Sequence, residues 1–199
     1  MSTYVRRLAT KNSGFTIVEL TVVVAVIAIL AAVTVVAYQG IQARANDATV
    51  KTAAENFATA LKQYSVRNSP PSGFGWGSTG PVTDGVCTGG NNGGWAQPNT
   101  YQCAIGDVML ANDYLPSNFF TELPKNEVYN SNRYVFMLYR CGGGNPANRY
   151  LLYYSLQNPN DQDDQQYIEN ANMCGISSPH AAAQYDRYGM RGSLVVDLD

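Results

Sequence analysis

One ionisable side chain stands inside the longest apolar stretch of this 199-residue chain. The stretch runs from Phe15 to Tyr38, and its only charged residue is Glu19. A carboxylate inside a membrane-spanning segment is costly and therefore a functional candidate. Phe15 lies four residues earlier, on the same helical face. If the chain were cut after Gly14, the new α-amino group of Phe15 could neutralise Glu19 in the same chain or in a neighbouring one. The alternative is that Glu19 lies at the headgroup edge of a membrane and is solvated.

The apolar stretch has the length of a membrane span. Residues 20–38 would form a helix of about 29 Å, close to the hydrocarbon thickness of a bilayer. Residues 1–14 carry Arg6, Arg7 and Lys11 and no acidic residue, and a short basic flank of this kind stays in the cytoplasm. The rest of the chain has ten basic and fifteen acidic residues, which opposes nonspecific binding to nucleic-acid phosphates. We therefore expect a single-pass membrane protein with a cytoplasmic N-terminus.

Two removable signals are alternatives to a retained span. A secretory signal peptide could be cut at Ala43-Arg44-Ala45, which would give a secreted protein, such as an enzyme, that begins near Asn46. Arg6-Arg7 is a minimal twin-arginine pattern. The apolar stretch is about twice as long as the usual hydrophobic region of a signal peptide, and Glu19 interrupts it. These two features favour the retained span.

Residues 14–20 read Gly-Phe-Thr-Ile-Val-Glu-Leu, after a short basic leader and before an apolar helix. This pattern resembles the class III signal of type IV pilins and of type II secretion pseudopilins, the N-methylphenylalanine prepilin family. The resemblance covers about residues 1–65. It implies that residues 1–14 are a cytoplasmic leader peptide, and that prepilin peptidase removes it by cutting between Gly14 and Phe15. It also implies N-methylation of Phe15.

The resemblance further implies a route of assembly. Glu19 would pair with the Phe15 amine of an adjacent subunit, and residues 15–38 would leave the membrane to form the core of a filament. The implied partners are identical or related pilin subunits, prepilin peptidase, an inner-membrane assembly platform and an assembly ATPase. Many members carry a proline where this chain has Val36. Its absence removes the usual cause of a helix kink and leaves Gly40 as a weaker point.

A second helical pattern extends from Gln39 to Arg67. Asp47 and Lys51 have the i, i+4 spacing of an ion pair on a helix. The sequence Ser-Pro-Pro-Ser-Gly after residue 68 cannot continue the helix. We expect one helix over residues 15–67, with a membrane-spanning half at 15–38 and an amphipathic half. The amphipathic half presents an apolar stripe at helical spacing, formed by Val50, Ala54, Phe57, Leu61 and Tyr64.

Residues 68–199 are predicted to form a globular, extracellular head. Its glycine-rich segment 70–98 predicts a long loop, which Trp76 and Trp95 would anchor. The head should contain a small antiparallel sheet within about residues 133–198, with one face on the helical stripe. The fold class is therefore α+β. The expected strands are residues 134–139, 150–156 and 193–197. Residues 142–148 would form the hairpin loop between the first two strands.

The chain has four cysteines, and none belongs to a Cys-x-x-Cys pair. Because the only histidine is His180, a zinc site is disfavoured. Outside the cytoplasm, disulfides are the default. Three pairings are possible, and we favour Cys87 with Cys103 and Cys141 with Cys174, because each would close a local loop.

The only acidic cluster lies at residues 158–169. Its composition is that of a calcium loop, but Asp163 occupies the place where an EF-hand requires glycine. We expect a solvated acidic loop, with calcium as the alternative. The weak metal candidates are Asp161, Asp163, Asp164 and Glu169.

No nucleophile–base pair and no phosphate-binding glycine motif can be recognised, so we expect a non-enzyme without a cofactor. The function we expect is that of a type IV pilin, a structural subunit of a cell-surface filament that supports adhesion and surface motility. One alternative is a pseudopilin of a type II secretion or competence (DNA uptake) system. A second alternative is a membrane-anchored binding module that never polymerises.

Overall fold

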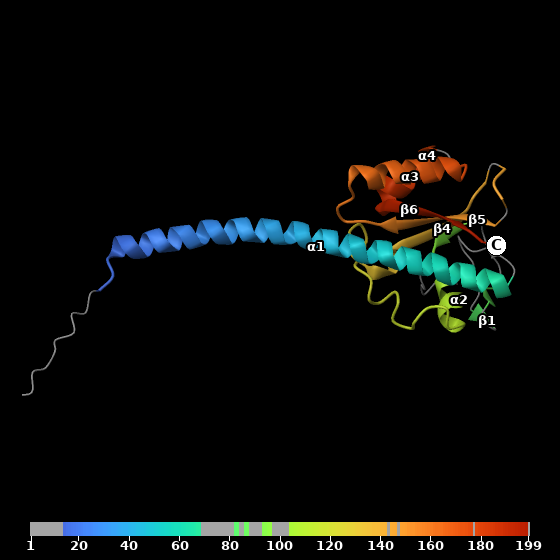
Figure 1. Cartoon of the computed structure of the whole chain (residues 1–199), viewed down its shortest axis with the longest axis horizontal. Helices are drawn as coiled ribbons and strands as arrows, with labels where there is room; N and C mark the ends of the chain where they lie inside the picture. The colour runs from blue at the N-terminus through green and yellow to red at the C-terminus, as the bar shows by residue number, and fades with distance from the viewer. Residues whose placement is uncertain are drawn as a thin grey trace, which may run out of the picture. The chain divides into compact units, whose positions relative to one another are not determined.

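A computed structural model describes residues 14–68, 82–83, 86–87, 93–96, 104–142, 144–146, 148–176 and 178–198. Its first element is helix α1, Ile17–Arg67 (Figure 1). The end of α1 agrees with the prediction, since Asn68 is the last residue before the Ser-Pro-Pro sequence. The N-terminal helix over residues 15–67 is thus confirmed, and it begins two residues later than expected.

The chain divides into two compact units, residues 1–41 and residues 42–199. In the described part of the first unit, the apolar side chains of α1 are exposed on all sides of the helix. By its length and composition α1 is the single helix in the described ranges that could cross a membrane. The second unit contains α1 from Gln42 onward, which is most of its amphipathic half, together with the described part of the head.

The second unit is built around an antiparallel sheet with the strand order β3-β4-β5-β6. The strands β4 and β5 form a hairpin, as predicted for residues 134–156, although Tyr134 belongs to a short 3₁₀ turn and not to the strand. A separate two-stranded ribbon precedes the sheet. The bounds are β1 Val82–Thr83, β2 Val86–Cys87, β3 Gly93–Trp95, β4 Phe136–Arg140, β5 Arg149–Ser155 and β6 Met190–Asp197.

One face of the sheet packs against the apolar stripe of α1, as predicted. Phe57 is fully buried, and its ring centroid lies 5.7 Å from that of Phe136 on β4 and 6.1 Å from that of Phe120. Helix α2, Ile105–Ala111, closes the same core. All five stripe residues are buried, which confirms the amphipathic reading of this half of α1: Val50, Ala54, Phe57, Leu61 and Tyr64.

The other face of the sheet is covered by two helices that the sequence analysis did not predict. These are α3, Asp161–Met173, and α4, Ser178–Tyr188, which lie on the side opposite α1 in Figure 1. Their apolar residues, such as Tyr167, pack on Tyr153 of β5 with ring centroids 5.1 Å apart. The sheet is therefore buried on both faces, and the unit has three layers.

The acidic segment 158–169 is not the solvated loop that we expected. Asn160 caps α3, and Asp161, Asp163 and Asp164 occupy its first turn. Carboxylates are favourable there because the helix dipole leaves partial positive charge at the N-terminus. The composition that resembles an acidic loop is thus that of a helix start.

The glycine-rich segment 70–98 lies largely outside the described residues, and Trp76 falls in that part. Trp95, on β3, has the predicted anchoring role. Its ring contacts those of Tyr129, Tyr134 and Tyr188, at centroid distances of 5.5, 4.9 and 5.6 Å. These contacts connect β3 to the segment before β4 and to the end of α4.

Candidate functional site

The predicted cleavage position lies just before α1. Gly14, Phe15 and Thr16 have no regular secondary structure, and α1 begins at Ile17. All three residues are exposed, and 87% of Phe15 is accessible. The bond between Gly14 and Phe15 is therefore in an open, non-helical stretch of backbone.

Thr16 and Glu19 form a reciprocal cap at the start of α1. The Thr16 backbone N–H donates to Glu19 Oε2 at 2.9 Å, and the Thr16 hydroxyl donates to the same oxygen at 2.8 Å. In return, the Glu19 backbone N–H donates to Thr16 Oγ1 at 3.2 Å. This is a capping box, which satisfies donors that the first turn of a helix leaves unpaired.

Both donors from Thr16 meet Glu19 Oε2, and within the described ranges no donor reaches Glu19 Oε1. The carboxylate therefore has a structural role and one uncommitted oxygen at the same time. Sequence reasoning named Glu19 but missed Thr16. The Thr-x-x-Glu spacing is the signal that identifies it.

Phe15 differs from the prediction in one respect. We expected it within the helix, one turn before Glu19 on the same face. Because Thr16 caps the helix, Phe15 precedes the first turn instead. An α-amino group at Phe15 would therefore precede the first helical turn and not form part of it.

From Leu20 to Val35 the surface of α1 is largely apolar and unburied. Thr21 and Thr34 are polar, but their hydroxyls donate to carbonyls of their own helix, Val18 O and Ala31 O, both at 2.9 Å. The exposed large side chains here include Leu20, Val22, Val23, Val24, Val26, Ile27, Ile29, Leu30, Val33 and Val35. A helix of this kind is stable in lipid or against other apolar helices, because its own backbone hydrogen bonds are satisfied.

Residues 9–35 match a family model for the prokaryotic N-terminal methylation motif. The chain carries this motif. The methylation motif is the class III signal of type IV pilins and pseudopilins, which confirms the resemblance drawn from residues 14–20. It supports a protein of the type IV pilin and pseudopilin class, and it implies processing by prepilin peptidase. In comparisons with curated proteins and with solved structures, no significant match to the chain was found.

The methylation motif and the apolar helix suit a membrane-anchored precursor. The α+β fold, a long N-terminal helix and a small antiparallel sheet, is pilin-like as well. Gly14, Phe15 and Glu19 all lie within the matched residues.

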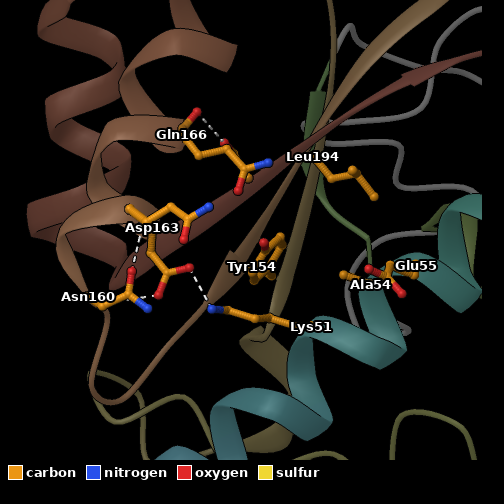
Figure 2. Close-up of a pocket in the computed structure, with 10 residues that line it drawn as sticks. Lys51, Ala54, Glu55, Tyr154, Asn160, Asp163, Gln166 and Leu194 are labelled. Carbon is orange, nitrogen blue, oxygen red and sulfur yellow. Dashed lines mark hydrogen bonds and ion pairs between the residues drawn. The ribbon is translucent and has the colours of Figure 1, made fainter.

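The acidic candidates for a metal site are dispersed over α3. Asp163 is buried and engaged, because Lys51 Nζ lies 2.5 Å from its Oδ1 and the Asn160 N–H donates to its Oδ2 at 3.0 Å (Figure 2). Asp164 accepts a hydrogen bond from the Tyr185 hydroxyl at 2.9 Å. Asp161 and Glu169 are exposed. Within the described ranges, no group of three or more acidic, histidine or cysteine side chains converges as a metal site would require.

Lys51 also departs from its predicted partner. We expected an ion pair with Asp47, one turn earlier on α1. The Asp47 carboxylate instead accepts the backbone N–H groups of Gln157 at 2.6 Å and Asn158 at 2.9 Å. Both α1 residues are thus turned toward the segment that leads into α3, where two unpaired N–H groups and the Asp163 carboxylate offer better partners than an exposed helix pair.

One of the two favoured disulfides is confirmed. Cys141, just after β4, is bonded to Cys174, the residue after α3, with the Cα atoms 4.5 Å apart. It joins the sheet to the α3–α4 layer. Cys103, the expected partner of Cys87, lies outside the described residues, so this pairing stays a prediction.

Proposed function

We propose that this chain is a type IV pilin, a structural subunit of a cell-surface filament that supports adhesion and surface motility. The observation that carries the proposal is Glu19 Oε1, which no donor reaches within the described part of the chain. It lies four residues after the expected methylation position Phe15, and the large exposed side chains that follow it, from Leu20 to Val35, are apolar. A single carboxylate in apolar surroundings is stabilised by a cation, and the α-amino group of Phe15 in a neighbouring subunit would be that cation.

In this proposal the precursor crosses the inner membrane once, with residues 1–14 in the cytoplasm. Prepilin peptidase removes these residues and methylates the amine of Phe15. An assembly platform and its ATPase then transfer the subunit into a filament. The chain itself performs no catalysis and carries no cofactor.

In the filament, the Phe15 amine of one subunit pairs with Glu19 Oε1 of the next. The pair neutralises a charge that is costly in apolar surroundings, so each incoming subunit is stabilised only in the correct register. The apolar helices then pack together. Repetition of this head-to-tail contact gives an open helical fibre.

The same motif also marks pseudopilins, so a type II secretion or competence pseudopilin is the second candidate. Both candidates use the same processing and the same helix contact. They differ in product: a pilin is abundant in fibres sheared from the cell surface, whereas a pseudopilin is needed for secretion or DNA uptake and stays in the envelope.

Substitution of Glu19 tests the proposal. Glu19→Ala should abolish incorporation into sheared fibres while the protein still inserts in the membrane, and Glu127→Ala, an exposed carboxylate of the head, should assemble normally. The native protein should begin at Phe15 with one added methyl group, as measured by intact mass. A native N-terminus near Asn46 would indicate a secreted protein, and a membrane-bound monomer that works equally well with Glu19→Ala would indicate a non-polymerising anchored module.

A further inference from the structure

The chemistry of peptide cleavage sets a requirement on the bond between Gly14 and Phe15. In hydrolysis the C–N bond breaks, water supplies a hydroxyl to the Gly14 carbonyl carbon, and its remaining proton goes to the Phe15 nitrogen. The carbonyl must therefore be open to attack. In an α-helix that included Gly14, its carbonyl would instead accept the N–H of the residue four positions later, Val18.

The structure keeps this carbonyl out of the helix. The hydrogen bond from Leu20 N–H reaches Thr16 O, at 3.2 Å, two residues after the cleavage position. Among the described residues, none donates a hydrogen bond to Gly14 O. The bond between Gly14 and Phe15 thus lies in a non-helical and exposed segment directly beside the helix start.

The start of α1 has competitors in the sequence. Asn12 and Ser13 are both of residue types that cap helices well. A helix capped at either one would include Gly14 and Phe15 in its first turn. Thr16 has an advantage over both, because it alone is followed three residues later by a glutamate, which completes the capping box.

From this geometry we propose that Thr16 is a positioning residue for the prepilin peptidase. Its capping box with Glu19 holds the helix start beyond the cleaved bond and presents Gly14–Phe15 as non-helical backbone. Glu19 then has two roles. Before cleavage its Oε2 accepts the hydrogen bonds of the capping box, and after cleavage its Oε1 can pair with an amine. The inference rests on the proposed function, since it concerns the processing of the same site.

The test is cleavage of the full-length precursor in detergent micelles by prepilin peptidase, with kcat and KM measured separately. Thr16→Val keeps the shape of the side chain but removes the hydroxyl, and should lower kcat/KM by about 2- to 30-fold, the population change that corresponds to loss of an N-cap. Thr16→Ser and Glu19→Gln both preserve the capping pattern and should be cut at close to the wild-type rate. Nuclear magnetic resonance of Gly14 and Phe15 should report a shift toward helical backbone in Thr16→Val alone.

A rescue experiment separates conformation from direct recognition of Thr16 by the peptidase. Adding Asn12→Ala and Ser13→Ala to Thr16→Val removes the competing caps, and should restore both the non-helical backbone and the cleavage rate. The same two substitutions in the wild-type background provide the reference rate. The inference is overturned if Thr16→Val is cut as fast as the wild type, if it is slowed without a helical shift at Gly14, or if the rescue restores the backbone but not the rate. Failure of the proposed function looks different: the wild-type precursor would not be cut after Gly14 at all.

Discussion

Lys51 on α1 and Asp163 on α3, 112 residues apart in the sequence, form an ion pair with an N–O distance of 2.5 Å. Asp163 is only 8% exposed and also shares a capping box with Asn160. The Asp163→Ala variant should lower the free energy of unfolding by about 2–3 kcal/mol, because it leaves the Asn160 N–H and the Lys51 ammonium group without their acceptor. Chemical denaturation of the detergent-solubilised protein measures this change. Asp161→Ala, an exposed residue of the same helical turn, is the matched control and should change stability by less than about 1 kcal/mol. Equal losses in both variants would contradict the assigned role of Asp163.

Asp47 should be as important as Asp163, although it makes no ion pair within the described part of the chain. Its buried carboxylate accepts two backbone N–H groups, those of Gln157 and Asn158. Asp47→Ala leaves both donors unpaired, and should cost about 2–4 kcal/mol of unfolding free energy. Asp47→Asn keeps one acceptor and should cost less. Thermal unfolding followed by near-ultraviolet circular dichroism would rank the two, and the reverse ranking would refute the hydrogen-bond explanation.

The disulfide between Cys141 and Cys174 closes a loop with a sequence separation of 33 residues. A closure of this size restricts the unfolded chain and contributes about 3–4 kcal/mol. Replacement of both cysteines by serine should therefore lower the denaturation midpoint substantially. A reducing agent should lower the denaturation midpoint of the wild type, and should lower that of the double variant by less. A double variant as stable as the oxidised wild type would show that the crosslink does not restrain the unfolded state.

The raised pKa of Tyr154 should cause the protein to lose stability at alkaline pH. Burial, with smaller contributions from the Asp163 and Glu55 carboxylates, raises the pKa of Tyr154 to about 12. The unfolded chain releases this proton near pH 10, so the folded state binds more protons between about pH 10 and 12, and stability falls as the pH rises through that window. Below pH 10 the stability is fully present.

The variant Tyr154→Phe isolates this effect, because the Tyr154 hydroxyl has no hydrogen-bond partner among the described residues. At neutral pH it should differ from the wild type by less than about 1 kcal/mol. At pH 11 it should be more stable than the wild type by about 1 kcal/mol, since one pH step of this linkage is worth about 1.4 kcal/mol. Urea denaturation at the two pH values measures the difference, and parallel curves for the two proteins would contradict the assignment.

Much of the fold could be predicted from local patterns. The apolar stretch after Glu19 and the stripe from Val50 to Tyr64 both have helical spacing, and the Pro-rich end after Asn68 is unambiguous. The three main strands were recognised for their aromatic and β-branched residues. The methylation motif could be recognised because its residues lie close together in a short segment, whereas the cleavage position and the pairing role of Glu19 stay predictions.

The second helical layer was missed because its signal is weak. The helix α3 has few apolar residues, and its three aspartates suggest a loop unless Asn160 is recognised as a cap. A further signal was available in β5, where the run Tyr150–Tyr154 does not alternate between apolar and polar residues. Such a run indicates a strand buried on both faces, which demands a covering layer.

The contacts of Lys51 and Asp47 could not be predicted in the same way. Within α1 the two residues have the spacing of a surface pair, which is worth only about 0.2–0.5 kcal/mol. Their real partners lie more than a hundred residues away and are brought close by the packing of the sheet against α1. A local rule therefore fails where tertiary structure offers a buried carboxylate and unpaired backbone donors.

The exposed apolar surface of α1 restricts the environments in which the chain is stable. The first half of α1 exposes apolar side chains on every side and would aggregate in water, so it requires lipid or other apolar helices around it. If the chain leaves a bilayer for a filament, as we propose, this exposed surface requires direct transfer from lipid to neighbouring subunits, without an intermediate dissolved in water.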